Sequence, residues 1–248
     1  MLNSTPIAET VLIDNVFTEK ETALTSKIGL RDILKIIRNL NYKTVRFNFK
    51  YFELKDAIRF PVFVKQTQFK KLEGKVKIDG LIRPGMIRIG YGYVGHFDRS
   101  LKSIWEVSGH VTFKGSALLK FGSKIVVGPE GNLQIGEKFR ISPQSSLICF
   151  KKITFGNACR LSWEVQVLDT DFHKIKTLEG DYLNPPKEII IGNHVWIGSR
   201  VSIMKGARID NDCIVASNSV VTKHLEGEHQ IIAGIPAKVV RTGVTWES

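Results

Sequence analysis

The sequence of 248 residues lacks the features that mark several large classes of protein. No stretch approaches the roughly 18 consecutive apolar residues of a membrane-spanning helix. Only three cysteines are present, Cys149, Cys159 and Cys213, which is an odd number without metal-ligand spacing. The first residues, MLNSTPIAETVLIDN, lack the basic start and apolar run of a signal peptide. These absences predict a cytoplasmic protein with no disulfide framework and no bound metal.

Acidic residues are scarce in the first third of the chain. Residues 27–77 hold 14 Lys and Arg against 4 Asp and Glu, which accounts for most of the net charge of +12. Such a surplus attracts anionic partners. Nucleic acid is not expected, because the basic residues are dispersed and no nucleic-acid-binding module is recognisable. Three interpretations of this basic region remain open. It binds an anionic membrane surface peripherally, at the inner membrane face; it binds a lipid-linked glycan; or it is merely a solvated basic face.

An internal repeat is the strongest pattern that is present. One aliphatic residue returns every six positions, and a smaller or β-branched residue follows it by four. A helix repeats at 3.6 residues and a strand at 2, so neither explains a period of six. Six residues per side of a three-sided coil does explain it. The aliphatic series is Ile191, Ile197, Ile203, Ile209, Val215 and Val221, and the second series is Val195, Val201, Ala207, Cys213 and Ser219.

The same register continues upstream, at Ile135, Ile141, Leu147 and Ile153, and again at Phe155, Leu161 and Val167 after a slip of two residues. Residues 168–190 break it and are predicted to form a protruding loop, which in a repeat protein is where function is usually located. The pattern predicts a β prism over residues 75–242, preceded by an N-terminal extension over 1–74 and followed by a C-terminal tail over 243–248.

The extension is predicted to be a small α/β element. In Ile28–Leu40, an apolar face of Leu30, Ile33, Leu34 and Ile37 predicts an amphipathic helix. Its expected role is to pack against the end of the prism; binding to a membrane surface is the alternative. Apolar residues alternate with polar ones from Val45 to Tyr51, which predicts a half-buried strand.

The stretch IIIGNHVWIGSRVSIMKGARIDNDCIVASNSVVTK, followed by IIAGIPAKVVR, resembles the hexapeptide-repeat acetyltransferases. The segment DTDFH, followed by NPPKEIIIGNHVWIG, resembles the branch that O-acetylates capsular and other surface polysaccharides. The resemblance is dense over 125–242 and hardly constrains 1–44. It implies an all-β fold, a left-handed parallel β-helix, assembled as a homotrimer. Left-handedness comes only from the resemblance, because parallel crossovers are otherwise right-handed.

The resemblance implies a site for acyl transfer from acetyl-CoA to a sugar hydroxyl. His173 is the expected general base, since an imidazole exchanges protons near neutral pH. Asp169 or Asp171 is a candidate to orient it, with Glu164 as a third; either aspartate could instead cap backbone amides. The amide of Ser199 is the expected oxyanion donor or pantetheine contact.

The remaining expected contacts are to the coenzyme. Trp196 and Gly198 match the segment beside the thioester, and Gly198 allows close backbone approach. Ser217, Thr222 and Lys223 match positions that hold the pantetheine arm and the adenine end. Lys238 and Arg241 match the cations that meet the phosphates. His194 is expected to face a turn. Where the family usually has Gly-Ala-Gly-Ser, this chain has Ala216-Ser217-Asn218-Ser219.

Three alternatives to a sugar O-acetyltransferase follow from the same residues. An N-acetyltransferase of a nucleotide-linked amino sugar would use the same base. A zinc hydratase on the same prism needs three converging histidines; His173 and His194 supply two, and His224 lies far along the chain. A non-catalytic glycan-binding scaffold is opposed by the intact set of His173, Trp196 and Lys223.

Overall fold

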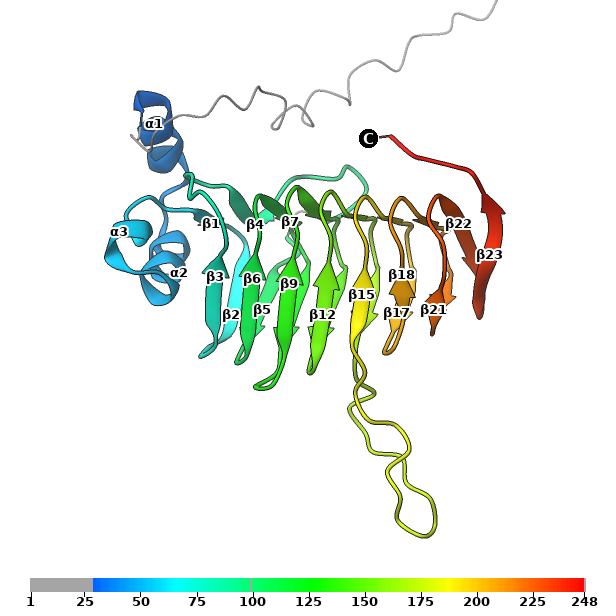
Figure 1. Cartoon of the computed structure of the whole chain (residues 1–248). Coiled ribbons are helices and arrows are strands. Elements are labelled where there is room, and N and C mark those ends of the chain that lie inside the picture. The colour runs from blue at the N-terminus through cyan, green and yellow to red at the C-terminus, as the bar shows by residue number, and fades with distance from the viewer. Residues whose placement is uncertain (1–28, 99, 248) are drawn as a thin grey trace, which may run out of the picture.

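The computed structural model describes residues 29–98 and 100–247, so part of the predicted extension, residues 1–28, lies outside the described residues. Within these described residues, three helices, α1 (Leu30–Asn39), α2 (Tyr42–Tyr51) and α3 (Leu54–Ala57), precede a stack of short strands. The strands form a three-sided prism with the helices at one end, and a long loop projects from its side (Figure 1).

Each side of the prism is one sheet, and the chain visits the three sheets in turn. Sheet A contains β1 (Val62–Val64), β4 (Ile87–Tyr91), β7 (Ala117–Lys120), β10 (Phe139–Ile141), β13 (Arg160–Leu161), β16 (Trp196–Ile197), β19 (Ile214–Val215), β22 (Gln230–Gly234) and β23 (Ala237–Thr242). Sheet B contains β2 (Thr67–Leu72), β5 (Ser103–Val107), β8 (Lys124–Val127), β11 (Ser146–Cys149), β14 (Gln166–Leu168), β17 (Ser202–Met204) and β20 (Val220–Val221). Sheet C contains β3 (Lys75–Ile78), β6 (His110–Phe113), β9 (Asn132–Ile135), β12 (Lys152–Phe155), β15 (Ile189–Ile191), β18 (Arg208–Ile209) and β21 (His224–Leu225).

The residues that recur every six positions are the ones that face the interior of these coils. Every aliphatic residue of the series from Ile191 to Val221 is buried, and so is every residue of the smaller series from Val195 to Ser219. Strand pairing stacks the aliphatic residues of successive coils on one another, for example Leu161 on Ile197 and Ile197 on Val215. All neighbouring strands are parallel except β22 and β23. The prediction of a mostly-β fold of parallel sheets is therefore confirmed.

The prism begins at Val62, before the expected boundary at residue 75, because β1 pairs with β4 as the first strand of sheet A. The early coils are longer than the late ones. The distance along the chain between stacked interior residues is 22 from Leu119 to Ile141, 20 from Ile141 to Leu161 and 18 from Ile197 to Val215. A period of six that continues from coil to coil without a slip is therefore visible only in the later coils.

The predicted strand over Val45–Tyr51 is wrong, because this segment is helix α2. Asn41 caps the helix, since its Oδ1 accepts from the amides of Lys43 and Thr44. The buried face of α2 includes the polar residues Thr44 and Asn48. Their side chains hydrogen-bond the backbone of Val64 and Val62 in edge strand β1. The helix thus covers the open end of the prism and satisfies its edge.

The predicted helix over Ile28–Leu40 is confirmed as α1, but its apolar face does not pack against the end of the prism as expected. Leu30, Ile33, Leu34 and Ile37 are all exposed, and α1 has no buried residue. At the other end of the prism, β23 folds back on β22, and the predicted tail places Trp246 against the prism with only 9% of its surface exposed.

Candidate functional site

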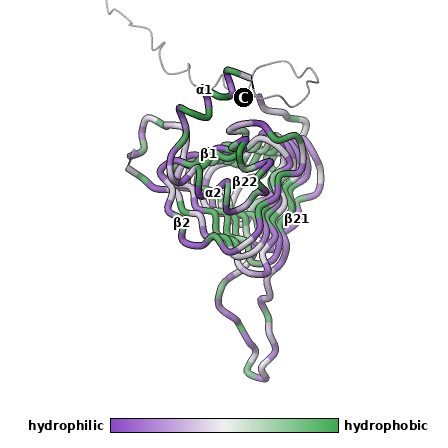
Figure 2. Tube along the Cα trace, turned by 90° about the vertical axis from the view of Figure 1, so that its left-hand side faces the viewer, coloured by the Kyte–Doolittle hydropathy of each residue, from purple (hydrophilic) through white to green (hydrophobic). Residues whose placement is uncertain are grey.

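The protruding loop leaves the prism at the corner between sheets B and C. It follows β14 and returns at β15, over residues 169–188. Figure 2 looks along the prism and shows the loop projecting from the corner opposite the sheet of β1 and β22, which is sheet A. His173 lies on this loop with an exposed side chain. In the described residues, the hydrogen bonds of His173 involve only its backbone, through its N–H to Asp171 O and through its carbonyl from Asn184 Nδ2.

Asp169 closes the base of the loop. Its side chain is buried, and its carboxylate accepts hydrogen bonds from three consecutive backbone amides, those of Phe150 (2.7 Å), Lys151 (2.8 Å) and Lys152 (2.7 Å). Its carbonyl accepts from the amide of Lys187 at the returning end of the loop. This geometry gives Asp169 the amide-capping role, and the cap is to the neighbouring coil rather than to the loop.

Asp171 is held by residues that the sequence analysis did not single out. Its Oδ2 accepts from Lys205 Nζ and from Asn184 Nδ2 (2.7 Å). Lys205 also donates to the carbonyl of Asn184 at 3.0 Å. Asn184, on the returning arm of the loop, bonds the backbone of the outgoing arm, donating to His173 O and accepting from the amide of Ile175 at 2.6 Å. This cluster therefore fixes the backbone at His173.

The hydrogen bond from the Lys205 ammonium, with a second from Asn184, lowers the pKa of Asp171 below its ordinary value of 3.8. A carboxyl whose folded-state pKa is depressed stabilises the fold above its unfolded pKa, and this contribution is lost as the pH falls through the lower value. The cluster is thus fully formed at neutral pH. Lys205 follows β17 at a corner of the prism, where a lysine normally indicates only a solvated position, so the sequence offered no signal for it.

If His173 is the general base that the resemblance implies, Lys205→Met should lower kcat about 10- to 100-fold, because small displacements of a catalytic group have effects of this size, and should leave the KM for acetyl-CoA unchanged. Lys176→Met, on an exposed residue of the same loop, is the matched control and should behave like the parent. Steady-state kinetics with each substrate varied measures both. An equal loss in the two variants, or a changed KM with parental kcat, would contradict the positioning role of Lys205.

Trp196 lies on the side of the prism opposite the loop, and Gly198, Ser199 and Ser217 lie at one edge of that side. Trp196 is on β16 in sheet A, 40% exposed, and its Nε1 donates to Ser162 Oγ at 3.1 Å. Ser199 and Ser217 are at successive turns of the corner between sheets A and B. No acceptor for the Ser199 amide is found within residues 29–98 and 100–247.

The stacking of the coils by itself requires glycine at position 198. A Cβ at this position would lie 2.8 Å from the backbone N of Ser217 and from Val215 O in the next coil. Glycine therefore allows two coils to stack closely, and the close approach predicted from the sequence is between coils of the chain itself.

The other predicted coenzyme residues divide between two places. Thr222 and Lys223 are exposed at the corner between sheets B and C, the corner that also carries the loop and Lys205. Lys238 and Arg241 are exposed on β23 at the end of sheet A, where they pair in register with Ala233 and Ile231. Glu164, the third candidate to orient His173, is at the corner between sheets A and B.

His194 has a packing role. Its ring stacks on Trp246 with centroids 4.3 Å apart, and its Nδ1 lies 2.8 Å from Asp212 Oδ1. Trp246 Nε1 donates to the His194 carbonyl at 2.8 Å. His224, on β21 of sheet C, instead contacts Asp210, which directly follows β18. Within the described residues, no three His, Cys, Asp or Glu side chains are grouped so as to hold a metal ion.

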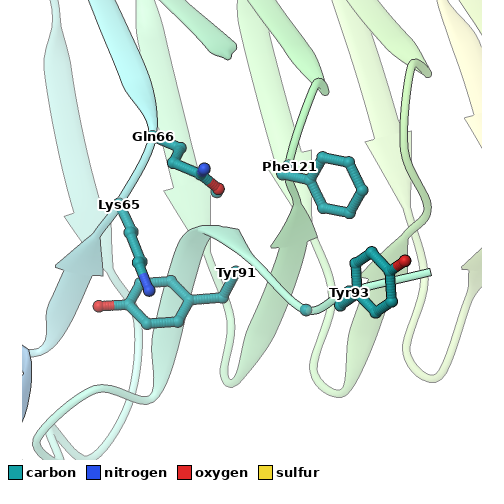
Figure 3. Close-up of a pocket in the computed structure, with 7 residues that line it drawn as sticks. Lys65, Gln66, Tyr91, Tyr93 and Phe121 are labelled. Carbon is teal, nitrogen blue, oxygen red and sulfur yellow. The ribbon is translucent and has the colours of Figure 1, made fainter. Parts of the chain in front are cut away.

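A pocket of about 360 Å³ lies at the corner between sheets A and B in the first coils (Figure 3). Tyr91, Tyr93 and Phe121 line it together with Lys65 and Gln66, and burial raises the pKa of Tyr91 to about 12. Aromatic rings beside an amine suit an organic ligand with an apolar face. The pocket contains none of the predicted site residues and lies nearer the helical end of the prism than Ser199 does.

Comparison with known proteins gives one family match. Residues 188–223 match the model of the bacterial transferase hexapeptide (six repeats). The polysialic acid O-acetyltransferase of Neisseria meningitidis is 35% identical over 150 residues, which cover 56% of this chain and 70% of that enzyme. The Escherichia coli polysialic acid O-acetyltransferase is 30% identical over 134 residues, 54% of this chain and 41% of that enzyme.

Among solved structures, the polysialic-acid-specific acetyltransferase NeuO matches with a TM-score of 0.42 and 20% identity, over 75% of this chain and 82% of that one. The identity to the meningococcal enzyme over more than two thirds of its length, together with the hexapeptide match, identifies the family. The chain belongs to the hexapeptide-repeat acetyltransferases and is an acyltransferase.

Proposed function

We propose that this enzyme transfers the acetyl group of acetyl-CoA to a sugar hydroxyl of a capsular or other surface polysaccharide. The family membership supports acetyl transfer, and the relatives named for polysialic acid support an acidic sugar polymer as acceptor.

The observation that carries the proposal is the position of His173 relative to Trp196 and Ser199. A prism with three sides sets the corner between sheets B and C opposite sheet A, and the loop projects outward from that corner (Figure 2). In this structure a base on the loop therefore lies away from the outer face of sheet A of its own chain. We propose a homotrimer of left-handed prisms, in which the loop of one chain meets Trp196 and Ser199 of the next.

In this arrangement His173 accepts the proton of the acceptor hydroxyl, and the alkoxide attacks the thioester carbonyl carbon. The Ser199 amide donates to the oxyanion of the tetrahedral intermediate. When the C–S bond breaks, the imidazolium returns its proton to the CoA sulfur. Asp171, Asn184 and Lys205 hold the loop that carries the base. The three cysteines are buried and unpaired, which supports a reducing, cytoplasmic location.

Incubation with acetyl-CoA and a panel of acceptors tests the function. We expect release of free CoA with oligomers of sialic acid or other acidic polysaccharides, and an acetylated product that loses acetyl in mild alkali, as an ester does. An alkali-stable acetamide on an amino sugar would instead identify an N-acetyltransferase. Binding of the glycan without release of CoA from any acceptor would indicate the non-catalytic scaffold.

The coenzyme end gives a separate prediction. Reversing the charge of both Lys238 and Arg241 to glutamate should raise the KM for acetyl-CoA far more than the KM for the acceptor, because the phosphates of CoA require cations. Both side chains are exposed on the last strand, so the fold should be unaffected. Equal changes in the two KM values would place these residues outside the coenzyme site.

A further inference from the structure

Helix α1 contacts the rest of the molecule through its polar face. Asp32, Lys35, Ile36 and Asn39 are its half-buried residues. At 100° per residue they lie on one side of the helix. Lys35 Nζ donates to the carbonyl of Pro84 at 2.6 Å, and burial lowers the pKa of this lysine. A lysine on the inner side of a surface helix reverses the usual arrangement, in which the apolar side faces the core.

The apolar face of α1 is turned outward. Leu30, Ile33, Leu34 and Ile37 are 73%, 44%, 46% and 62% exposed. They occupy the side of the helix opposite Lys35 and Asn39, so no described element covers them. Single exposed apolar residues are ordinary, but a contiguous apolar face bordered by polar groups is a binding surface.

Helices α2 and α3, which neighbour α1 at this end of the prism (Figure 1), also expose apolar side chains. Tyr42, Val45 and Phe49 form the exposed apolar side of α2, and Leu54 and Ile58 are exposed in and beside α3. Cations border these residues and acidic groups are few. Apart from the inward-facing Lys35, the basic residues of the three helices are Arg31, Arg38, Lys43, Arg46, Lys50 and Lys55, against Asp32, Asp56 and the α3 cap Glu53, which pairs with Lys55.

We propose that the helical end of the molecule binds the surface of an anionic lipid bilayer, with α1 in the headgroup layer and its outward face on the acyl chains. Apolar residues beside Lys and Arg, on a helix of low overall hydrophobicity, are the composition of interfacial helices. Anionic headgroups complement the basic border. A ten-residue helix is about 15 Å long, half the hydrocarbon thickness, so it lies on the bilayer rather than across it.

This surface is separate from the acetyl-transfer site, since it involves none of the residues placed there. Its effect is to hold the enzyme where a membrane-bound glycan is made, while the loop and the late strands of sheet A, such as β22, lie away from the helices (Figure 1). Described residues include no helix long and apolar enough to cross a membrane. Surface binding is therefore the form of association that α1 supports.

Vesicle sedimentation with the full chain tests the proposal. The parent should sediment with vesicles of phosphatidylcholine and phosphatidylglycerol, more weakly with phosphatidylcholine alone, and less at high salt. Ile33→Gln/Ile37→Gln, which keeps the charge and the helix propensity, should lower the partition coefficient about tenfold or more, because two buried aliphatic side chains are lost from the lipid contact. Arg31→Gln/Arg38→Gln should weaken binding to the anionic vesicles and leave binding to pure phosphatidylcholine vesicles unchanged.

The matched control is Ile175→Gln/Leu178→Gln, which removes apolar surface from the exposed loop and should sediment like the parent. Circular dichroism and melting temperature report that each variant is folded. Failure of the folded parent to bind anionic vesicles overturns the proposal, as does equal binding by the α1 variant. A changed oligomeric mass or a lowered melting temperature in Ile33→Gln/Ile37→Gln, with vesicle binding unchanged, assigns the face to another chain or to residues 1–28 instead.

Discussion

Replacement of His173 by alanine is expected to lower kcat by a factor of about 10² to 10⁴, the usual contribution of a general base. The imidazole is exposed on the loop and outside the buried core of the prism. Its loss therefore opens no cavity, and surface substitutions usually alter stability by less than about 0.5 kcal/mol. The melting temperature and CoA affinity should match those of the parent, as measured by thermal unfolding and calorimetry.

His194→Ala is the matched control, because it removes the same ring from a position with a different role. It should keep most of the activity and lower the melting temperature, since it removes the stacking on Trp246 and the contact with Asp212. If His173→Ala retains more than about a tenth of the parental kcat, it falls short of even the lower end of that range, and another residue is the base.

The sequence predicts the later coils well and the early ones poorly for a physical reason. From Ile191 onward most strands have two residues and each side of the prism takes six, so the buried positions recur without interruption. In the earlier coils, strands such as β8 and β9 bury two side chains each, Ile125 with Val127 and Leu133 with Ile135. Longer strands and turns change the spacing and hide the same architecture.

Helix α2 shows how an alternating pattern misleads. Val45, Phe47, Phe49 and Tyr51 alternate as in a strand, but only Phe47 among them is fully buried. The residues that determine the structure are the cap at Asn41 and the polar residues Thr44 and Asn48, whose partners are backbone groups of β1. Those partners lie well beyond the helix in sequence, so no local pattern indicates them.

Some of the residues around the predicted base could be identified from the sequence, and others could not. The resemblance to the hexapeptide-repeat acetyltransferases indicates His173, which lies at the start of the one long interruption of the repeat. The roles of Asp169 and Asp171 could not be separated from the sequence, because their partners belong to neighbouring coils: the amides of Phe150 to Lys152 for Asp169, and Lys205 for Asp171. Register between coils is a tertiary property. Lys205 and Asn184 were missed for this reason.

The loop and sheet A lie on opposite sides of the prism. If they meet in a site shared between two chains, two inactive variants should complement each other when their chains are mixed in one trimer. One chain carries His173→Ala, and the other carries glutamate in place of Lys238 and Arg241. In a shared site, one chain supplies the loop and its neighbour supplies β23, so a mixed trimer contains sites in which both contributions are intact. With equal co-expression and random assembly around a threefold axis, about one quarter of the sites are intact.

We therefore expect the co-expressed enzyme to recover about a quarter of the parental activity per site, when acetyl-CoA is kept far below the KM of the charge-reversed variant. The two variants, purified separately and assayed together without exchange of chains, should show only their residual activities. This control separates true subunit mixing from addition of two weak enzymes. If co-expression gives no more than the sum of the residual activities while sedimentation confirms mixed trimers, the base and the coenzyme cations belong to the same chain. In that case the loop must fold back around the prism to reach sheet A, and the shared site is wrong even though acetyl transfer itself stands.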